Sequence, residues 1–310
     1  MTGDAAGAQA GVFKSAFVAL VGRPNSGKST LVNTVLGEPI SIVTSLPQTT
    51  RTILRGIYTD NNLQLIFLDT PGIHRGKHAL NKSMYARSTG VLADGGADVI
   101  CHIVDLSREL GDEEDAIASL TADIPSPVCI VFNKIDLCAD AGARRATFFS
   151  RYPRLASRPR ISISAIDPSA KKTLLDMLLP LIGPGPRYFP GDDLTDADMR
   201  FIAAEFIRRR IIESTREEVP HAVCVEISAY RELADRHEIE AVIHVETDGQ
   251  KGIVIGARGT LINKIRRQAR GDIAALCGAP VSLTCHVRVT PHWRDNPRFL
   301  AQMGLLDAGE

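Results

Sequence analysis

The sequence lacks the cysteine patterns that build metal sites or disulfide frameworks. None of its six cysteines belongs to a C-x-x-C pair or to a matching C…H cluster, which argues against a structural zinc site and against a small secreted disulfide scaffold. The cysteines stand at positions 101, 129, 138, 224, 277 and 285. We expect them to be reduced core thiols of a cytosolic protein.

The chain also lacks a long apolar run and a leader sequence. No apolar stretch approaches the roughly 18 residues that a membrane-spanning helix needs. The N-terminal stretch MTGDAAGAQAGVFKSAF does not combine a basic start with an apolar core of signal-peptide length. These absences predict a cytoplasmic protein with no integral membrane segment.

Neither sign of charge is in excess. The 36 Lys and Arg residues balance the 36 Asp and Glu residues, so net charge does not point to a polyanionic partner, and any nucleic-acid surface has to be local. A chain of 310 residues with 44% hydrophobic residues is long enough for two domains, each with its own core.

Short apolar runs alternate with amphipathic stretches through the first half of the chain. Runs rich in Val and Ile predict buried parallel strands of an α/β sheet, whose ligands bind beyond the carboxyl ends of the strands. The predicted strands cover residues 17–22, 63–69, 98–105, 128–134 and 160–166. We therefore expect an α/β domain with a mostly parallel sheet over residues 14–182.

A stretch dense in Gly and Pro, residues 183–194, predicts a linker. Thr195 and Asp198 then resemble a capping box, which predicts that a helix begins there and extends to residue 214. The second domain is expected over residues 195–303.

The first predicted strand leads directly into the run GRPNSGKST, residues 22–30. Its spacing matches G-x-x-x-x-G-K-[ST], in which a turn between a strand and a helix points backbone N–H groups at a polyphosphate. Lys28 is expected to bridge the β- and γ-phosphate oxygens, and the Ser29 hydroxyl to ligate Mg²⁺. The candidate phosphate-binding residues of this loop are Gly22, Asn25, Ser26, Gly27, Lys28, Ser29 and Thr30.

Two further motifs follow at the ends of predicted strands. In DTPG, residues 69–72, Asp69 stands where a carboxylate would hold the Mg²⁺ shell, and Gly72 would offer its N–H to the γ-phosphate. In NKID, residues 133–136, the Asp136 carboxylate can accept hydrogen bonds from N1–H and the 2-amino group of guanine, donors that adenine lacks.

Neighbouring residues complete the predicted guanine site. Asn133 and the stem of Lys134 would brace the loop and cover the base. The run SAI, which comprises Ser164, Ala165 and Ile166, would supply backbone N–H groups near the guanine O6.

Together and in this order, the motifs resemble the GTPase domain of the translation-factor class. The resemblance implies a switch-loop threonine that completes the Mg²⁺ shell, and PQTTR at 47–51 offers Thr50, with Thr49 as the alternative. Ile73 stands where Ras-like proteins carry a glutamine that orients water, so intrinsic hydrolysis should be slow. Asn25 resembles the asparagine of potassium-activated GTPases, which implies a K⁺ ion that stabilises transition-state charge.

The sequence pattern of the second half of the chain predicts, in order, a helix, two strands, a helix, the G-x-x-G tetrad, a helix and a strand. The strands are expected at 222–230, 238–247 and 281–289, a turn at 248–252, and a longer helix after the tetrad at 260–277. This order resembles a type II KH domain, a smaller α+β module that clamps single-stranded RNA along the G-x-x-G loop. The candidate RNA-binding residues are Gly256, Ala257, Arg258, Gly259, Lys264, Arg266 and Arg267, within a locally basic region.

Over nearly the whole length, the chain resembles the Era family of bacterial ribosome-assembly GTPases. The resemblance implies a monomeric, Mg²⁺-dependent and K⁺-stimulated GTPase that binds GTP and GDP. It also implies binding to 16S ribosomal RNA near its 3′ end, a role in maturation of the small (30S) subunit, and peripheral association with the inner face of the cell membrane. One departure is Ala257, where the family often has lysine, and Arg258 is the candidate replacement.

Two alternatives differ in what GTP does. An RNA-binding chaperone could hold GTP as a slowly turned-over ligand, and the missing glutamine leaves that reading open. A tRNA-modification GTPase is disfavoured because no further catalytic domain and no C-terminal cysteine motif is visible.

Overall fold

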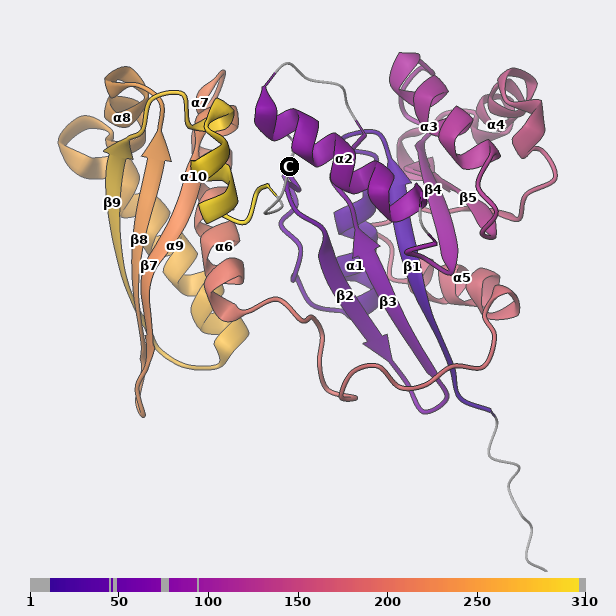
Figure 1. Cartoon of the computed structure of the whole chain (residues 1–310), viewed down its shortest axis with the longest axis horizontal. Coiled ribbons are helices and arrows are strands. Elements are labelled where there is room, and N and C mark those ends of the chain that lie inside the picture. The colour runs from indigo at the N-terminus through magenta and orange to yellow at the C-terminus, as the bar shows by residue number, and fades with distance from the viewer. Residues whose placement is uncertain (1–11, 45, 47–48, 74–77, 94, 307–310) are drawn as a thin grey trace, which may run out of the picture.

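The computed structural model describes residues 12–44, 46, 49–73, 78–93 and 95–306. Two β-sheets lie in separate parts of the molecule, with the C-terminal segment between them (Figure 1). The first sheet has the strand order β2-β3-β1-β4-β5-β6, and all neighbouring pairs are parallel except β2 with β3. Its strands are β1 (Lys14–Gly22), β2 (Leu54–Thr59), β3 (Leu63–Asp69), β4 (Val99–Asp105), β5 (Val128–Asn133) and β6 (Arg160–Ser162).

Helices cover both faces of this sheet. Alternation along β1 divides the core, because Val18 and Leu20 pack on one face while Ala19 and Val21 pack on the other. Residues of α1 and α5 pack on the first face, and residues of α3 and α4 pack on the second. The helices are α1 (Lys28–Leu36), α2 (Ala79–Ala93), α3 (Asp112–Ala122), α4 (Ala141–Arg151) and α5 (Ser169–Leu178), with 3-10 turns η1 (Ile135–Leu137), η2 (Pro153–Leu155) and η3 (Leu179–Leu181).

The second sheet is smaller, with the order β7-β8-β9, and β8 pairs antiparallel with β7 and parallel with β9. Helices α6 and α9 share its apolar core. The elements are α6 (Met199–Ser214), α7 (Val219–Ala222), β7 (Cys224–Glu232), β8 (His237–Val245), α8 (Asp248–Ile255), η4 (Ala257–Gly259), α9 (Thr260–Cys277), β9 (Val281–Val289), η5 (Trp293–Asp295) and α10 (Pro297–Gln302). The predicted fold class, a mostly parallel α/β sheet followed by a smaller α+β unit, is confirmed.

Three local predictions are wrong in detail. The turn expected at 248–252 belongs to α8, because the Thr247 hydroxyl accepts a hydrogen bond from the Gln250 amide and starts the helix. The predicted capping box is absent, since Asp198 itself is the N-cap of α6 and accepts from the Phe201 amide at 2.7 Å. The strand expected at 160–166 ends at Ser162.

The stretch 183–194 passes across the amino ends of β1 and β3 and reaches the edge strand β2 on its way to the second sheet (Figure 1). The Gly185 amide donates to the Phe13 carbonyl at 3.1 Å, and the Leu194 carbonyl accepts from the Ile57 amide at 2.8 Å. The buried Gln64 side chain accepts from the Tyr188 amide at 2.8 Å. This connecting stretch is therefore hydrogen-bonded to the sheet along its length.

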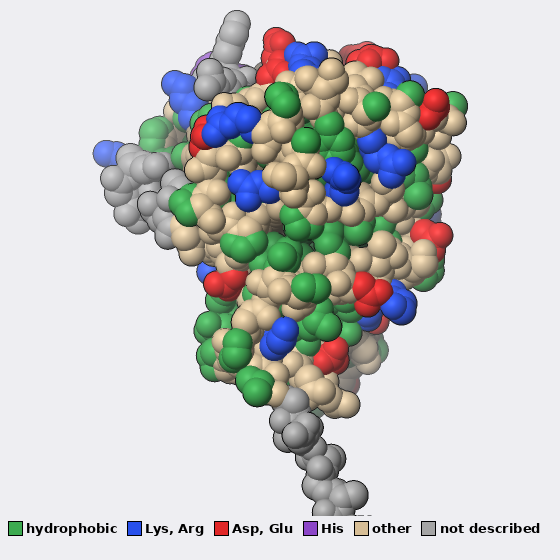
Figure 2. Space-filling view, turned by 90° about the vertical axis from the view of Figure 1, so that its right-hand side faces the viewer, with side chains coloured by type: hydrophobic (Ala, Val, Ile, Leu, Met, Phe, Trp, Pro, Cys, Tyr) green, Lys and Arg blue, Asp and Glu red, His purple; other side chains and the backbone are tan. Residues whose placement is uncertain are grey.

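The surface beside α4 and α5 carries charges of both signs. Figure 2 shows that face with basic and acidic side chains interspersed among apolar ones, as the neutral composition predicts. In the part of the chain that the structure describes, no helix is both long and apolar enough to cross a membrane.

Candidate functional site

The loop between β1 and α1 makes a close turn at the carboxyl end of the sheet. Gly27 has a φ of +98°, and a Cβ there would lie 2.2 Å from Nδ2 of Asn133, so contact as well as backbone conformation demands glycine. The ammonium group of Lys28 points back into the loop and donates to the carbonyls of Gly22 and Arg23, each at 3.1 Å. Burial lowers the pKa of Lys28 to about 8, against the opposing effect of the Asp69 charge.

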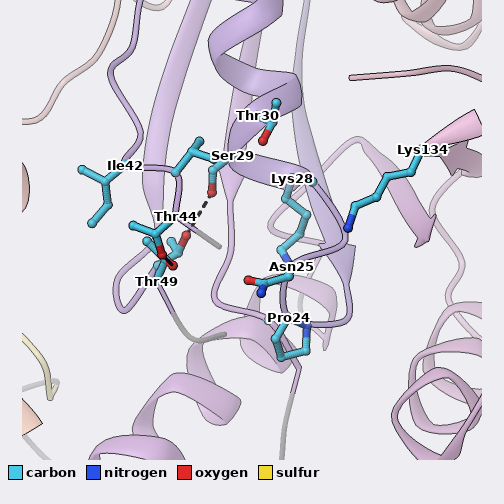
Figure 3. Close-up of a pocket in the computed structure, with 13 residues that line it drawn as sticks. Pro24, Asn25, Lys28, Ser29, Thr30, Ile42, Thr44, Thr49 and Lys134 are labelled. Carbon is cyan, nitrogen blue, oxygen red and sulfur yellow. Dashed lines mark hydrogen bonds between the residues drawn. The ribbon is translucent and has the colours of Figure 1, made fainter. Parts of the chain in front are cut away.

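A cavity of about 330 Å³ opens in front of this loop (Figure 3). Asn25, Lys28 and Lys134 line one side of it, and the Ser29–Thr50 hydrogen bond lies on the other. Most of the predicted phosphate-binding residues line the cavity: Asn25, Gly27, Lys28, Ser29, Thr30 and Gly72. Gly22 and Ser26 do not line it, and the Ser26 amide donates to the Arg23 carbonyl inside the loop.

Two of the residues predicted to hold Mg²⁺, Ser29 and Thr50, line the cavity, and the third, Asp69, lines a small adjoining pocket together with Thr50. The Ser29 and Thr50 hydroxyl oxygens are 3.0 Å apart. The Asp69 carboxylate is fully buried, its Oδ2 accepts from the Ser41 hydroxyl at 3.0 Å, and its Oδ1 has no hydrogen-bond partner among the described residues. Burial raises the pKa of Asp69, an effect that a bound cation would reverse.

This donor set fits Mg²⁺, which prefers oxygen ligands and usually combines one or two carboxylates with phosphate oxygens and water. No group of three or more His, Cys, Asp or Glu residues that could hold a metal occurs within the described ranges, so the hydroxyls and the nucleotide would have to supply the remaining ligands. Thr49 is less suited than Thr50, because its hydroxyl contacts the Thr44 hydroxyl at 2.7 Å and the Leu46 carbonyl at 2.9 Å.

The predicted guanine-binding loops meet at Asn133, at the end of β5. Its buried side chain donates to the Ser26 carbonyl and accepts from the Ala165 amide, both at 2.8 Å, and so joins the phosphate loop to the SAI segment. The Ala165 amide is thus already hydrogen-bonded. Beside it, the Ser164 carbonyl accepts from the Asp167 amide, and the Ile166 side chain is 72% exposed.

Lys134 and Asp136 follow Asn133 into this loop. Lys134 has a φ of 62°, and its ammonium nitrogen reaches Oδ2 of Asp105 at 2.7 Å. Asp136 is exposed and makes no ion pair with the described residues, so its carboxylate is available to a base.

Three residues around the cavity escaped the sequence reasoning. Ser41 holds Asp69, Asp105 holds Lys134, and the buried Arg23 donates to the Glu109 carbonyl at 2.8 Å behind the phosphate loop. Asp105 could have been found, because it ends the strand next to β5 and pairs in register with Asn133. Ser41 lies in an irregular segment that carries no pattern.

Ile73, the residue after DTPG, points away from the cavity. Its side chain is 1% exposed and belongs to the core on the α3 and α4 face of the sheet, while its amide donates to the Gly22 carbonyl at 3.3 Å. No water-orienting side chain is therefore presented from this position.

The G-x-x-G loop joins α8 to α9 through left-handed backbone. Gly256, Arg258 and Gly259 have φ values of 73°, 50° and 76°, and a Cβ on Gly256 would lie 2.7 Å from the Leu261 Cβ. The Gly259 position is open, with no atom within 3.7 Å of an added Cβ other than its chain neighbours. Ala257 and Arg258 are exposed at the start of α9, whose N-terminal amides favour an anion.

The basic residues of α9 divide between two faces. Lys264 and Arg267 are three apart and share a face, whereas Arg266 is turned by about 100° from Arg267. Arg266 lies close enough to β9 that its charge lowers the pKa of Cys285, against the larger raising effect of burial. All three cations are exposed.

Comparison with known proteins assigns the two parts separately. Residues 17–134 match the family described as 50S ribosome-binding GTPase, and residues 218–294 match the KH domain family. The fold and the cavity thus define a GTPase domain followed by a KH domain.

Whole-chain relatives narrow the class further. GTPase Era of Geotalea uraniireducens is 41% identical over 295 residues, covering 94% of this chain and 98% of that protein. GTPase Era of Staphylococcus haemolyticus is 38% identical over 296 residues, covering 95% and 98%. The chain belongs to the Era family of GTPases.

Two solved Era structures share the arrangement of nearly the whole chain. Era in complex with MgGDPNP and nucleotides 1506–1542 of 16S ribosomal RNA superposes with a TM-score of 0.90 at 32% identity, covering 95% of this chain and all of that one. Aquifex aeolicus Era bound to GDP·AlF4⁻ gives 0.88 at 32% identity with the same coverage.

Proposed function

We propose that this protein is a GTP-hydrolysing switch that binds 16S ribosomal RNA near its 3′ end and assists maturation of the 30S subunit. The observation that carries the proposal is that one chain joins a phosphate cavity with a Mg²⁺-type donor set to an exposed, left-handed G-x-x-G loop. A similar Era structure contains MgGDPNP together with nucleotides 1506–1542 of 16S ribosomal RNA, which supports the proposal that this chain binds both a guanine nucleotide and RNA.

In this proposal each part of the nucleotide has its own residues. Lys28 and the amides of the phosphate loop bind the β- and γ-phosphates, and Asp136 selects guanine. Ser29 and Thr50 would ligate Mg²⁺ directly, and Asp69 would hold its water shell. When bound, Mg²⁺ neutralises charge on the phosphate oxygens, and the buried Asp69 and Ser41 keep its site ordered.

The potassium site is a separate proposal. Asn25 lines the cavity with a backbone φ of 61°, and Ile73 supplies no catalytic group, so a monovalent cation near Asn25 would offset charge on the β/γ-bridging oxygen. Turnover of GTP should be faster in KCl than in NaCl at equal ionic strength. Equal rates in the two salts, or a potassium effect that persists in Asn25→Ala, would refute the proposed potassium site.

For the RNA, we propose that Gly256 to Gly259 hold the backbone of a single strand while Lys264, Arg266 and Arg267 attract it. The domain limits proposed are 14–182 and 195–303, joined by 183–194. The protein would act as a monomer in the cytoplasm, with peripheral association at the inner face of the membrane.

The test uses the full chain and a synthetic RNA with the sequence of nucleotides 1506–1542. We expect this RNA to bind, and its binding to change when GDPNP replaces GDP. Failure of the RNA to bind in either nucleotide state would refute the proposal. If RNA binds but GTP is not hydrolysed with or without it, the chaperone reading replaces the switch.

A further inference from the structure

Three consecutive residues connect the nucleotide cavity to the KH domain. The Thr50 hydroxyl faces Ser29 in the cavity, while its two neighbours contact the other domain. The Thr49 carbonyl accepts a short hydrogen bond from Nη2 of Arg208, which belongs to α6. The Arg51 guanidinium donates to the Val223 carbonyl at 2.7 Å and to the His221 carbonyl at 3.3 Å.

Both arginines are buried where the two domains meet. Arg51 and Arg208 are 5% and 2% exposed, and the Arg51 guanidinium lies 5.5 Å from the centre of the Trp293 ring. The Trp293 indole is held in turn by a 2.8 Å hydrogen bond to the Ala222 carbonyl. Burial, together with the Arg208 charge, lowers the pKa of Arg51 to about 9.

Buried guanidinium groups need well-placed acceptors, because an unpaired charge in such a place is strongly destabilising. The Glu205 carboxylate pairs with Arg208 on the α6 side, so the Thr49 carbonyl is held by a charge that is itself fixed. Thr50 is therefore flanked on both sides by contacts to the KH domain, one through the Thr49 backbone and one through the Arg51 side chain.

The segment that follows DTPG is tied to the same domain. Asp295 of η5 accepts from the Ala79 amide at 2.9 Å and lies 2.7 Å from Nδ1 of His78, at the start of α2. Leu80 and Met84 of α2 pack in one apolar cluster with Trp293. The KH domain thus contacts both the segment that carries Thr50 and the helix that follows DTPG in the chain.

We propose that Arg208 and Arg51 are positioning residues for Thr50, so that the KH domain helps to set how tightly Mg²⁺ and a nucleoside triphosphate are held. This inference rests on the proposed GTP switch and adds the regulation of its Mg²⁺ site. By linkage, a ligand that binds the KH domain and moves α6 or α7 changes triphosphate affinity, and the triphosphate changes that ligand's affinity by the same factor.

The test compares Arg208→Leu with Arg209→Leu in the full chain. Arg209 is the next residue of α6 but pairs with Glu213 at the surface, so it is a matched control. We expect Arg208→Leu to weaken MgGDPNP binding about tenfold, a factor within the usual range of coupling between two sites. The variant should also need a higher Mg²⁺ concentration for half-maximal binding. GDP affinity should change less than about twofold, because loops of this kind are ordered through the γ-phosphate and its Mg²⁺.

A double-mutant cycle with Thr50→Ala separates positioning from general damage. If Arg208 acts through Thr50, the double variant should bind MgGDPNP no worse than Thr50→Ala alone. Losses that simply add, or an Arg208→Leu protein with the parent's Mg²⁺ dependence, would overturn the proposal. If Arg208→Leu fails to fold, Arg51→Lys replaces it in the same cycle, because the lysine keeps the charge but not the fork to two carbonyls.

The 1506–1542 RNA provides an independent readout. We expect GDPNP to change RNA affinity in the parent and in Arg209→Leu, and to change it less in Arg208→Leu; an undiminished effect in Arg208→Leu would contradict the coupling. An RNA that does not bind the parent would refute the proposed RNA function and leave the double-mutant cycle with Thr50 as the test of positioning.

Discussion

The ammonium nitrogen of Lys134 lies 2.7 Å from Oδ2 of Asp105, and this ion pair holds the lysine at the edge of the nucleotide cavity. The Asp105 side chain is fully buried, and its Oδ1 accepts from the amide and the hydroxyl of Ser107. The Asp105 carboxylate is therefore held by three contacts, one to Lys134 and two to the amide and hydroxyl of Ser107. It in turn fixes the position of the Lys134 ammonium group.

Asp105→Ala should weaken GTP and GDP binding alike by about tenfold, which corresponds to about 1.4 kcal/mol. The lysine stem covers the base in both nucleotides, so kcat should change little while KM rises. Titration calorimetry and steady-state kinetics measure the two effects. Asp123→Ala, which breaks an exposed ion pair with Arg154, is the control and should change neither. Unaltered affinity in Asp105→Ala would show that Lys134 needs no such support.

Asp136→Asn should cost on the order of 3 kcal/mol in GTP affinity, because an amide N–H₂ would face a donor of the base. Inosine triphosphate lacks the 2-amino donor, so its affinity should fall less than that of GTP. Competition binding with both nucleotides checks this difference. Equal losses for the two bases would show that Asp136 does not contact the 2-amino group, and an unchanged GTP affinity would place Asp136 outside the base contact.

Ile73→Gln should destabilise the protein without accelerating hydrolysis. The side chain at 73 is 1% exposed among apolar residues, so a glutamine there would bury an amide, at a cost of about 2 kcal/mol in the free energy of unfolding. Denaturant unfolding and single-turnover kinetics provide the two measurements. Faster turnover in the variant would mean that the side chain can reach the attacking water.

Nucleotide affinity should fall as pH rises above about 8, through Lys28. Phosphate favours the ammonium form, so above a pKa of about 8 binding must take up a proton, and the loss approaches tenfold per pH unit. The sign for stability is opposite. The unfolded chain, with a Lys pKa near 10.5, binds more protons than the folded chain above pH 8, so the contribution of Lys28 to unfolding free energy rises with pH up to about 10.5.

Calorimetry of GDP binding between pH 7 and pH 9, in buffers with different ionisation enthalpies, measures the proton uptake directly. Lys28→Met is the control, because any titration of the nucleotide itself remains in that variant. A parent protein with no more proton uptake than Lys28→Met would contradict the prediction.

Gly259→Asp should weaken binding of the 1506–1542 RNA by at least about 2 kcal/mol, because it places an unpaired charge opposite phosphate. Either Asn or Asp can be placed at position 259 without disturbing the loop, because both tolerate the φ of 76° and the position has room for a side chain. Gly259→Asn is therefore the isosteric control and should retain most of the binding in a filter or fluorescence assay. GTP affinity without RNA should be unchanged in both variants. Equal RNA binding by the Asp variant and the parent would restore the reading of this tetrad as a plain turn between helices.

Sequence patterns predicted the elements that depend only on residues close together in the chain. Helix α9 and strand β9 begin and end at the predicted residues, and the phosphate loop follows from its spacing, because backbone amides around a phosphate allow few alternatives. Strand β2 was not predicted. Its residues 54–59 carry no marker beyond a short apolar alternation, and its antiparallel pairing depends on β3.

Contacts between residues far apart in the sequence could not be predicted from local patterns. Arg208 and the Thr49 carbonyl are 159 residues apart, and no spacing rule connects them. The choice between Thr49 and Thr50 was open for the same reason. Both are loop threonines, and only the surroundings of each hydroxyl, Thr44 in one case and Ser29 in the other, separate them.

The connecting stretch 183–194 has a mechanical consequence for motion between the domains. Because Leu194 and Thr195 pair with the backbone of β2, a rotation of the KH domain cannot pivot within the stretch itself without breaking those hydrogen bonds. Between Thr195 and the N-cap of α6 at Asp198, the Asp196 side chain also pairs with Arg55 of β2, so such a rotation has to break that ion pair as well. The backbone pairing of Leu194 and Thr195 occupies part of the outer edge of β2, the terminal strand of the six-stranded sheet, and so blocks it as a template for a strand from another molecule.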